Sequence, residues 1–262
     1  HSWYQMVLGF NESYYYWMDE GFTNYAAERV MNHLRSKGLI PGDPDPRPFE
    51  SFYNGYIDLV MSGVEEPLST HADHFEDAGA YGAAAYQKGA LFLYQLEYVI
   101  GKPAFDQGLL DFFNTWKFKH PDDNDFIRVM EKSSGLELDW YRDYMVYSLK
   151  TVDYSVDTVF AYQEQSAIIL ERIRDMPMPI DVVINTKAGT QLYYTIPLDI
   201  MRGAKEERGP DDKPYELLHD WNWVNPSYLF VVPFTPDQIQ SVTIDPYMRM
   251  LDLDRENNVW AY

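Results

Sequence analysis

Three residues whose side chains suit metal-assisted hydrolysis stand at fixed spacings in the first third of the chain. His1 is followed by 18 residues and then by Glu20, within the segment Trp17–Phe22. Tyr86 stands 66 positions after Glu20 and begins a Tyr-x-Lys-Gly pattern. Imidazole and carboxylate are ligands that zinc accepts in hydrolytic sites. A phenol can donate a hydrogen bond to an oxyanion that forms during a reaction. The three residues are therefore candidates for one site.

Each of these residues also has an ordinary interpretation when it is taken alone. His1 could come from an expression tag. Glu20 is a carboxylate in the first turn of a predicted helix, where the helix dipole favours an acid. Tyr86 is one of 22 tyrosines. Only the joint spacing of the three favours the chemical interpretation.

The joint pattern resembles the gluzincin metallopeptidases, the aminopeptidase N and leukotriene A4 hydrolase family. Their signature is His-Glu-x-x-His, a glutamate at the spacing seen here, and a Tyr-x-Lys-Gly motif about 65 residues later. The resemblance implies that His1 is the second histidine ligand of zinc, Glu20 the third ligand and Tyr86 the donor to the oxyanion. Tyr81 matches a tyrosine that lines the substrate site in some members. Asp19 stands where the family has asparagine.

The first histidine and the neighbouring glutamate, which is the general base of the family, are not among these 262 residues. On the resemblance, they would be supplied by an upstream N-terminal segment or by a separate chain. The implied parent protein is a zinc aminopeptidase that hydrolyses the N-terminal bond of a peptide with metal-activated water. The chain as given is then expected to be inactive alone. Two alternatives remain open, a non-catalytic scaffold of the same fold and a zinc epoxide hydrolase.

Composition excludes several other classes of function. The chain has no cysteine, so it has neither disulfides nor a thiol nucleophile, and that absence fits any compartment. Its formal charge of −20 repels phosphate backbones, which argues against nucleic acid as a partner. No run of 18 apolar residues occurs, so no membrane span is expected.

The patterning predicts an α+β protein with two domains, a helical one over residues 1–153 and a β-rich one over residues 154–262. Apolar residues spaced three and four apart, as in Phe105, Leu109, Phe112 and Trp116, are typical of amphipathic helices. Predicted helices cover residues 19–34, 83–100, 105–116, 122–132 and 138–147. The resemblance implies that this domain is the helical C-terminal half of a thermolysin-like catalytic domain, followed by a β-sandwich.

Short runs of β-branched and aromatic residues predict the strands of the second domain. These strands cover residues 166–170, 180–185, 192–196, 228–232 and 241–244. The charged stretch 203–214 is predicted to be a mobile loop. His71 and His74 are spaced as metal ligands can be, but they lie in an acidic segment that is predicted to be a solvated loop.

Overall fold

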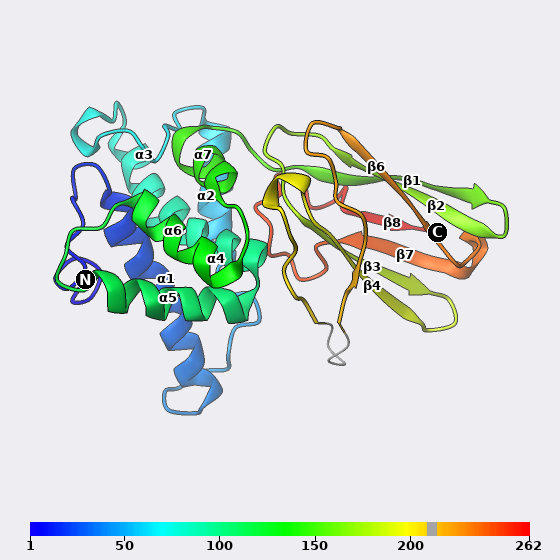
Figure 1. Ribbon diagram of the computed structural model, residues 1–262, viewed down its shortest axis with the longest axis horizontal. Coiled ribbons are helices and arrows are strands. Elements are labelled where there is room, and N and C mark those ends of the chain that lie inside the picture. The colour runs from blue at the N-terminus through cyan, green and yellow to red at the C-terminus, as the bar shows by residue number, and fades with distance from the viewer. Residues whose placement is uncertain (209–213) are drawn as a thin grey trace. The chain divides into compact units, whose positions relative to one another are not determined.

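The computed structural model describes residues 1–208 and 214–262, so residues 209–213 of the predicted charged loop lie outside the described residues. The chain forms two compact units (Figure 1). The first unit consists of residues 1–97, 102–133 and 138–149, and the second of residues 98–101, 134–137 and 150–262. The protein is therefore an α+β protein with a helical part and a β part, as the sequence predicts.

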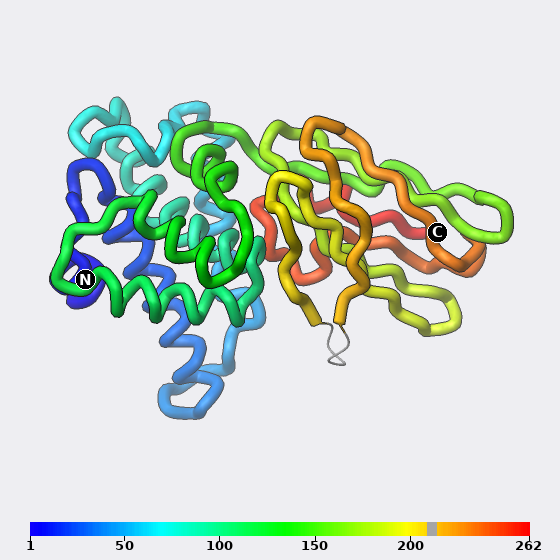
Figure 2. Tube along the Cα trace, in the orientation of Figure 1, coloured from blue at the N-terminus to red at the C-terminus, as the bar shows by residue number. Residues whose placement is uncertain are grey.

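The first unit is built mainly from helices and the loops that join them. Figure 2 shows that an irregular segment, residues 1–15, precedes the first helix. The helices are α1 (Tyr16–Ser36), α2 (Glu50–Ser62), α3 (Ala78–Gly82), α4 (Gly89–Ile100), α5 (Lys102–Trp116), α6 (Asp123–Ser134) and α7 (Asp139–Tyr147). A 3-10 turn covers Ala72–His74 within the segment that was predicted to be a loop, and a π-helical turn covers Ala83–Lys88.

An aromatic cluster forms the core of this unit and holds α1 in place. Trp17 and Phe22 of α1 are fully buried. The ring of Phe22 lies 4.9 Å from that of Phe126, and Trp17 lies 4.9 Å from Phe92, both edge to face. Edge-to-face pairs of this kind stabilise a core beyond the burial of their area. The apolar side of α1 is therefore fixed, and its acidic first turn faces a defined direction.

The predicted helix over residues 83–100 is continuous but not uniform. Its first turn, Ala83–Lys88, is π-helical, and the regular helix α4 begins only at Gly89. The hydrogen bonds of a π turn span one residue more than those of an α-helix, and such turns occur frequently at functional sites. This irregularity changes the direction of Tyr86 relative to the face that a regular helix would give it.

The second unit contains a three-stranded sheet, ordered β1-β2-β6, and a five-stranded sheet, ordered β5-β4-β3-β7-β8 (Figure 1). Neighbouring strands are antiparallel except β4 and β5, which are parallel. The strands are β1 (Tyr154–Tyr162), β2 (Gln165–Arg172), β3 (Ile180–Thr186), β4 (Gln191–Ile196), β5 (Glu216–Leu217), β6 (Ser227–Val232), β7 (Ile239–Ile244) and β8 (Val259–Ala261).

The burial of each strand explains whether that strand could be predicted from the sequence. β3 is buried along nearly its whole length. It is the central strand of its sheet, with Val183 opposite Tyr193 of β4 on one side and Thr243 of β7 on the other. Central strands of this kind give continuous apolar runs. The five predicted strands correspond to β2, β3, β4, β6 and β7, whereas β1, β5 and β8 were not predicted. Among the described residues, no helix has the length and apolar character that crossing a membrane requires.

Candidate metal centre

His1 and Glu20 lie in direct contact. Nε2 of His1 is 3.2 Å from Oε2 of Glu20, although 18 residues separate them along the chain. The carbonyl oxygen of His1 accepts hydrogen bonds from the backbone N–H groups of Gln5 and Met6 at 3.2 and 3.1 Å, so a turn holds the backbone of His1. The structure therefore brings together the imidazole and the carboxylate that the sequence pattern singles out.

Asp19 holds the other edge of the same imidazole. Its Oδ1 lies 2.8 Å from Nδ1 of His1, and Asp19 is 4% exposed. When this carboxylate accepts a hydrogen bond from the N–H group at Nδ1, the lone pair of Nε2 is left directed at Glu20. Carboxylates in this position orient the histidine ligands of metals. The sequence marked Asp19 only as a departure from the family's asparagine, and its contact with His1 was not predicted.

Tyr86 completes the cluster from the π turn. Its phenol lies close to the carboxylate of Glu20, and hydrogen bonding to that carboxylate, followed by burial, raises the pKa of Tyr86 to about 12. The side chain amide of Asn24 on α1 donates to the carbonyl oxygen of Tyr86 at 3.3 Å. The phenol thus stays protonated at neutral pH and able to donate a hydrogen bond.

Tyr81 lies at the edge of this cluster. It belongs to α3, and its ring packs 5.0 Å from Tyr16 and 5.5 Å, edge to face, from Phe75. Burial, followed by the charge of Glu20, raises the pKa of its phenol. The charge of Glu20 therefore acts on the phenol of Tyr81, and aromatic contacts hold the ring of Tyr81.

The site is an acidic environment. The pKa of Asp19 is raised to about 6, mainly by burial and further by the charge of Glu12. Burial also raises the pKa of Glu20, a change that the hydrogen bond from Tyr86 opposes and the charges of Asp19 and Glu12 reinforce. Clustered carboxylates that resist ionisation in this way are stabilised by a cation placed between them.

The pair of ligand atoms fits zinc. Tetrahedral zinc, with bonds of about 2.0–2.2 Å, places neighbouring ligand atoms about 3.3–3.6 Å apart. The separation of 3.2 Å between His1 Nε2 and Glu20 Oε2 is close to the lower end of this range. Oε2 of Glu20 is also buried and has no hydrogen-bond partner. A buried acceptor without a donor is costly, and a metal ion would satisfy it. His1 and Glu20 are therefore a suitable donor set for two of the ligand positions of zinc.

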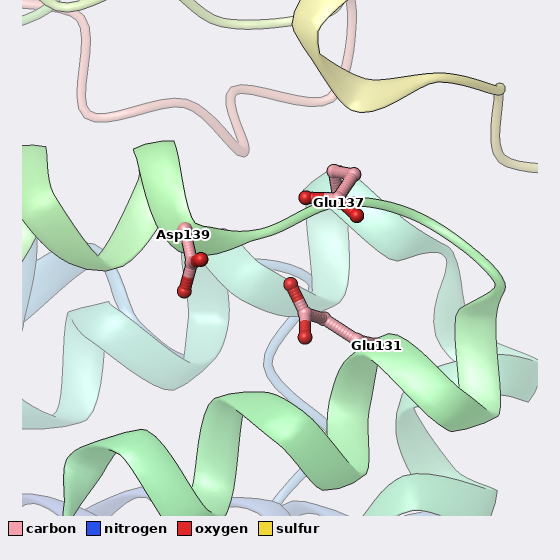
Figure 3. A group of neighbouring side chains, drawn as sticks. All are labelled: Glu131, Glu137 and Asp139. Carbon is pink, nitrogen blue, oxygen red and sulfur yellow. The ribbon is translucent and has the colours of Figure 1, made fainter.

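A second acidic cluster does not share these properties. The carboxylates of Glu131, Glu137 and Asp139 lie within 4.8 Å of one another near the connection between α6 and α7 (Figure 3). The cluster contains no imidazole, and Oε1 of Glu131 accepts a hydrogen bond from the backbone N–H of Leu138 at 3.0 Å. Acidic groups near a helix junction are common without a metal, and we assign this cluster no role.

Comparison with known proteins agrees with the resemblance. The chain is 25% identical over 138 residues to a leukotriene A-4 hydrolase homolog of Botryotinia fuckeliana, an alignment that covers 48% of this chain and 19% of that protein. It is 30% identical over 133 residues to leucine aminopeptidase 2 of Aspergillus clavatus, which covers 48% of this chain and 20% of that protein. The chain thus spans about one fifth of the length of these relatives.

A solved structure supports the same fold. The crystal structure of Legionella pneumophila aminopeptidase A in complex with aspartic acid matches 91% of this chain and 24% of its own chain, with a TM-score of 0.55 and 14% sequence identity. At this identity, the match supports the fold alone. The Peptidase family M1 domain matches residues 1–145, more than half of the chain. By this match, the chain belongs to peptidase family M1.

Proposed function

We propose that this chain carries part of the active site of a zinc aminopeptidase. His1 and Glu20 would hold the metal, and Tyr86 would donate a hydrogen bond to the substrate. The observation that carries the proposal is the geometry at Oε2 of Glu20, which is buried, accepts no hydrogen bond and lies 3.2 Å from Nε2 of His1. An acid placed only for helix stability would have solvent or a donor at this oxygen.

Each residue would have a defined task. Zinc, when bound, would polarise the scissile carbonyl and lower the pKa of water to about 7. Tyr86, protonated at neutral pH, would donate its phenolic hydrogen to the carbonyl oxygen as negative charge develops there. Asp19 would keep Nε2 of His1 free by accepting from Nδ1. Tyr81, whose ring packs on Tyr16 and Phe75, would line the space beside Tyr86 where a peptide substrate binds.

The remaining parts of the site would come from outside these residues. A histidine ligand and a general base are needed to complete the chemistry, and we propose that an upstream segment or a separate chain provides them. An apolar groove of about 500 Å³ offers a surface for such a segment, and its lining includes Trp3, Tyr4, Leu8, Val30 and Leu110. Trp3 is 63% exposed and Leu110 is 59% exposed, as expected for residues that another segment covers.

Zinc binding by the chain tests the first part of this proposal. We expect the purified chain to take up about one zinc per molecule with modest affinity, because two protein ligands hold a metal less securely than three. Glu20→Ala should abolish this uptake, measured by competition with a zinc-sensitive dye. Uptake that is unchanged in Glu20→Ala would overturn the assignment of Glu20.

Activity tests the second part. In a protein that also carries the upstream segment, we expect release of an amino acid from its anilide. Tyr86→Phe should lower kcat on the order of 10²–10³-fold, the usual loss for one oxyanion donor. A full rate in Tyr86→Phe would remove the role of the phenol. Zinc binding without any hydrolysis would instead favour the scaffold alternative, and hydrolysis of an epoxide but not of the anilide would favour the epoxide hydrolase.

A further inference from the structure

A short segment after α2 contacts both elements that carry the candidate site. The carbonyl oxygen of Leu68 accepts a hydrogen bond from the phenol of Tyr16 on α1 at 3.1 Å. Three residues earlier, Oε1 of Glu65 lies 2.6 Å from Nζ of Lys88 at the end of the π turn. We call Glu65–Leu68 the strap. It joins α1, which carries Glu20, to the π turn, which carries Tyr86.

The contact with α1 is on the side of the helix that carries Glu20. Tyr16 is four residues before Glu20, so the two side chains lie on the same face, one turn apart. Tyr16 is 1% exposed and Leu68 is fully buried. A buried hydrogen bond between them holds the strap to the first turn of α1, close along the helix to the carboxylate of Glu20.

The contact with the π turn is an ion pair out of solvent. The side chain of Lys88 is 3% exposed and that of Glu65 is 7% exposed. Two buried charges are tolerated only when each meets the other, so either would be costly if the turn moved away. Lys88 is two residues after Tyr86 in the same turn. The ion pair therefore restricts the backbone of the π turn close to Tyr86.

We propose that the Glu65–Lys88 ion pair is a positioning device that keeps the phenol of Tyr86 on the carboxylate of Glu20. Neither Glu65 nor Lys88 touches the cluster of His1, Glu20 and Tyr86 in the contacts described, so the pair acts through the π turn. The importance for catalysis of the contact between the Tyr86 phenol and the Glu20 carboxylate rests on the proposed function. The contact itself is a property of the folded chain and is tested without zinc or substrate.

The experiment places 3-fluorotyrosine at position 86 of the chain and records its ¹⁹F chemical shift. Glu20→Gln replaces the acceptor of the phenol, so it should shift the resonance when the two residues are in contact. We expect Lys88→Met to abolish this response to Glu20→Gln. Glu65→Gln keeps an acceptor oxygen for Lys88, so it should retain part of the response.

Lys205→Met is the matched control. Nζ of Lys205 lies 2.6 Å from Asp181, the same separation as in the Glu65–Lys88 pair, but in the second unit. Lys205→Met should lower the stability of the chain and leave intact the ¹⁹F response of position 86 to Glu20→Gln. If Lys88→Met does not fold, the double variant Glu65→Met/Lys88→Met removes both charges and leaves neither unpaired.

The outcomes separate the two proposals. A folded variant without the pair, in which Glu20→Gln still shifts the resonance by the full wild-type amount, would overturn the positioning role. Loss of the response in Lys205→Met as well would show a general effect of stability and would also overturn it. A chain that binds no zinc but loses the response in Lys88→Met would contradict the proposed function and uphold the positioning role.

Discussion

Gly21 and Gly89 meet at the point where α1 passes the start of α4. A Cβ built on Gly21 would lie 2.3 Å from the carbonyl carbon of Gly89, and one built on Gly89 would lie 2.8 Å from the carbonyl oxygen of Trp17. Neither position has room for a side chain. Because Glu20 precedes one glycine and Tyr86 lies three residues before the other, this close approach brings the carboxylate and the phenol together. Gly21 belongs to the segment Trp17–Phe22, which contains Glu20, and Gly89 is the last residue of the Tyr-x-Lys-Gly pattern.

Gly21→Ala should therefore destabilise the helical unit. The added methyl group would meet backbone atoms, which cannot rotate away as a side chain can. We expect a loss of about 3 kcal/mol in the free energy of unfolding, at the upper end of the usual cost of overpacking. Urea denaturation followed by far-UV circular dichroism measures this loss.

Gly82→Ala is the control for that experiment. Gly82 is in a right-handed helical conformation (φ −60°, ψ −45°), and a Cβ built on it has no atom within 4 Å. Alanine is favoured over glycine at such positions, so Gly82→Ala should raise stability by about 0.4–1 kcal/mol. Equal effects of the two substitutions would contradict a steric role for Gly21.

Asp19 should matter for zinc although it does not bind the metal in our proposal. Its carboxylate lies 2.8 Å from Nδ1 of His1, so Asp19→Ala removes the group that orients the ring. We expect a 10–100-fold loss in zinc affinity, as is typical when such a partner is removed. Asp19→Asn keeps an acceptor oxygen and should lose less. Glu12→Gln removes a nearby charge and leaves the contact between Asp19 and the imidazole of His1 in place. If Glu12→Gln lowered zinc affinity as much as Asp19→Ala, the effect of Asp19 would come from its charge and not from orientation of the ring.

The sequence predicted which residues of the candidate site would meet, but not how the chain holds them. The spacing of His1, Glu20 and Tyr86 follows from short motifs, and the structure brings all three together. Their roles as metal ligands and as a donor stay predictions. The Glu65–Lys88 pair was not predicted because no local pattern links two residues that are 23 positions apart.

The limits of the fold prediction have similar causes. Strand β1 was missed because its second half is largely exposed and lacks a clear alternation of apolar and polar residues. Lys205 lies in a stretch that its charges mark as a mobile loop, yet its side chain is fully buried. Local composition does not reveal a partner such as Asp181, which comes from β3. The domain boundary after residue 153 stays a prediction.

Stability of the second unit should fall as the pH rises from about 4 to 7, through Asp252. Burial raises the pKa of this carboxyl from its ordinary 3.8 to about 7. Between these values the folded state keeps the proton and the unfolded chain releases it, so rising pH favours unfolding. The full effect is up to about 4 kcal/mol, measurable by urea denaturation at a series of pH values.

Asp252→Asn isolates this effect from the other carboxylates. Asp252 accepts hydrogen bonds from the backbone N–H groups of Tyr154 and Asp254, each at 3.0 Å, so the variant loses part of this bonding at every pH. What should disappear is the pH dependence that Asp252 contributes. A difference between variant and wild type that stays constant from pH 4 to 7 would argue against a raised pKa of Asp252.

Lys205 anchors a buried polar network in the second unit, and its removal should be costly. Its Nζ lies 2.6 Å from Asp181 and donates to the carbonyl oxygen of Tyr98 at 2.8 Å, with the ring of Tyr98 3.7 Å away. Lys205→Met leaves the buried carboxylate of Asp181 without its counter-charge. We expect a loss of about 3–5 kcal/mol, the usual cost of breaking one side of a buried pair.

The exposed pair of Lys102 and Asp106 offers the comparison that tests this reasoning. The side chain of Lys102 is 56% exposed, so water and salt already screen its charge. Lys102→Met removes the same type of side chain and should cost less than about 1 kcal/mol. High salt should reduce this small difference and leave the loss in Lys205→Met nearly unchanged, because the buried pair is shielded from ions. Similar losses in the two variants would mean that the Lys205–Asp181 contact contributes no more than a surface pair.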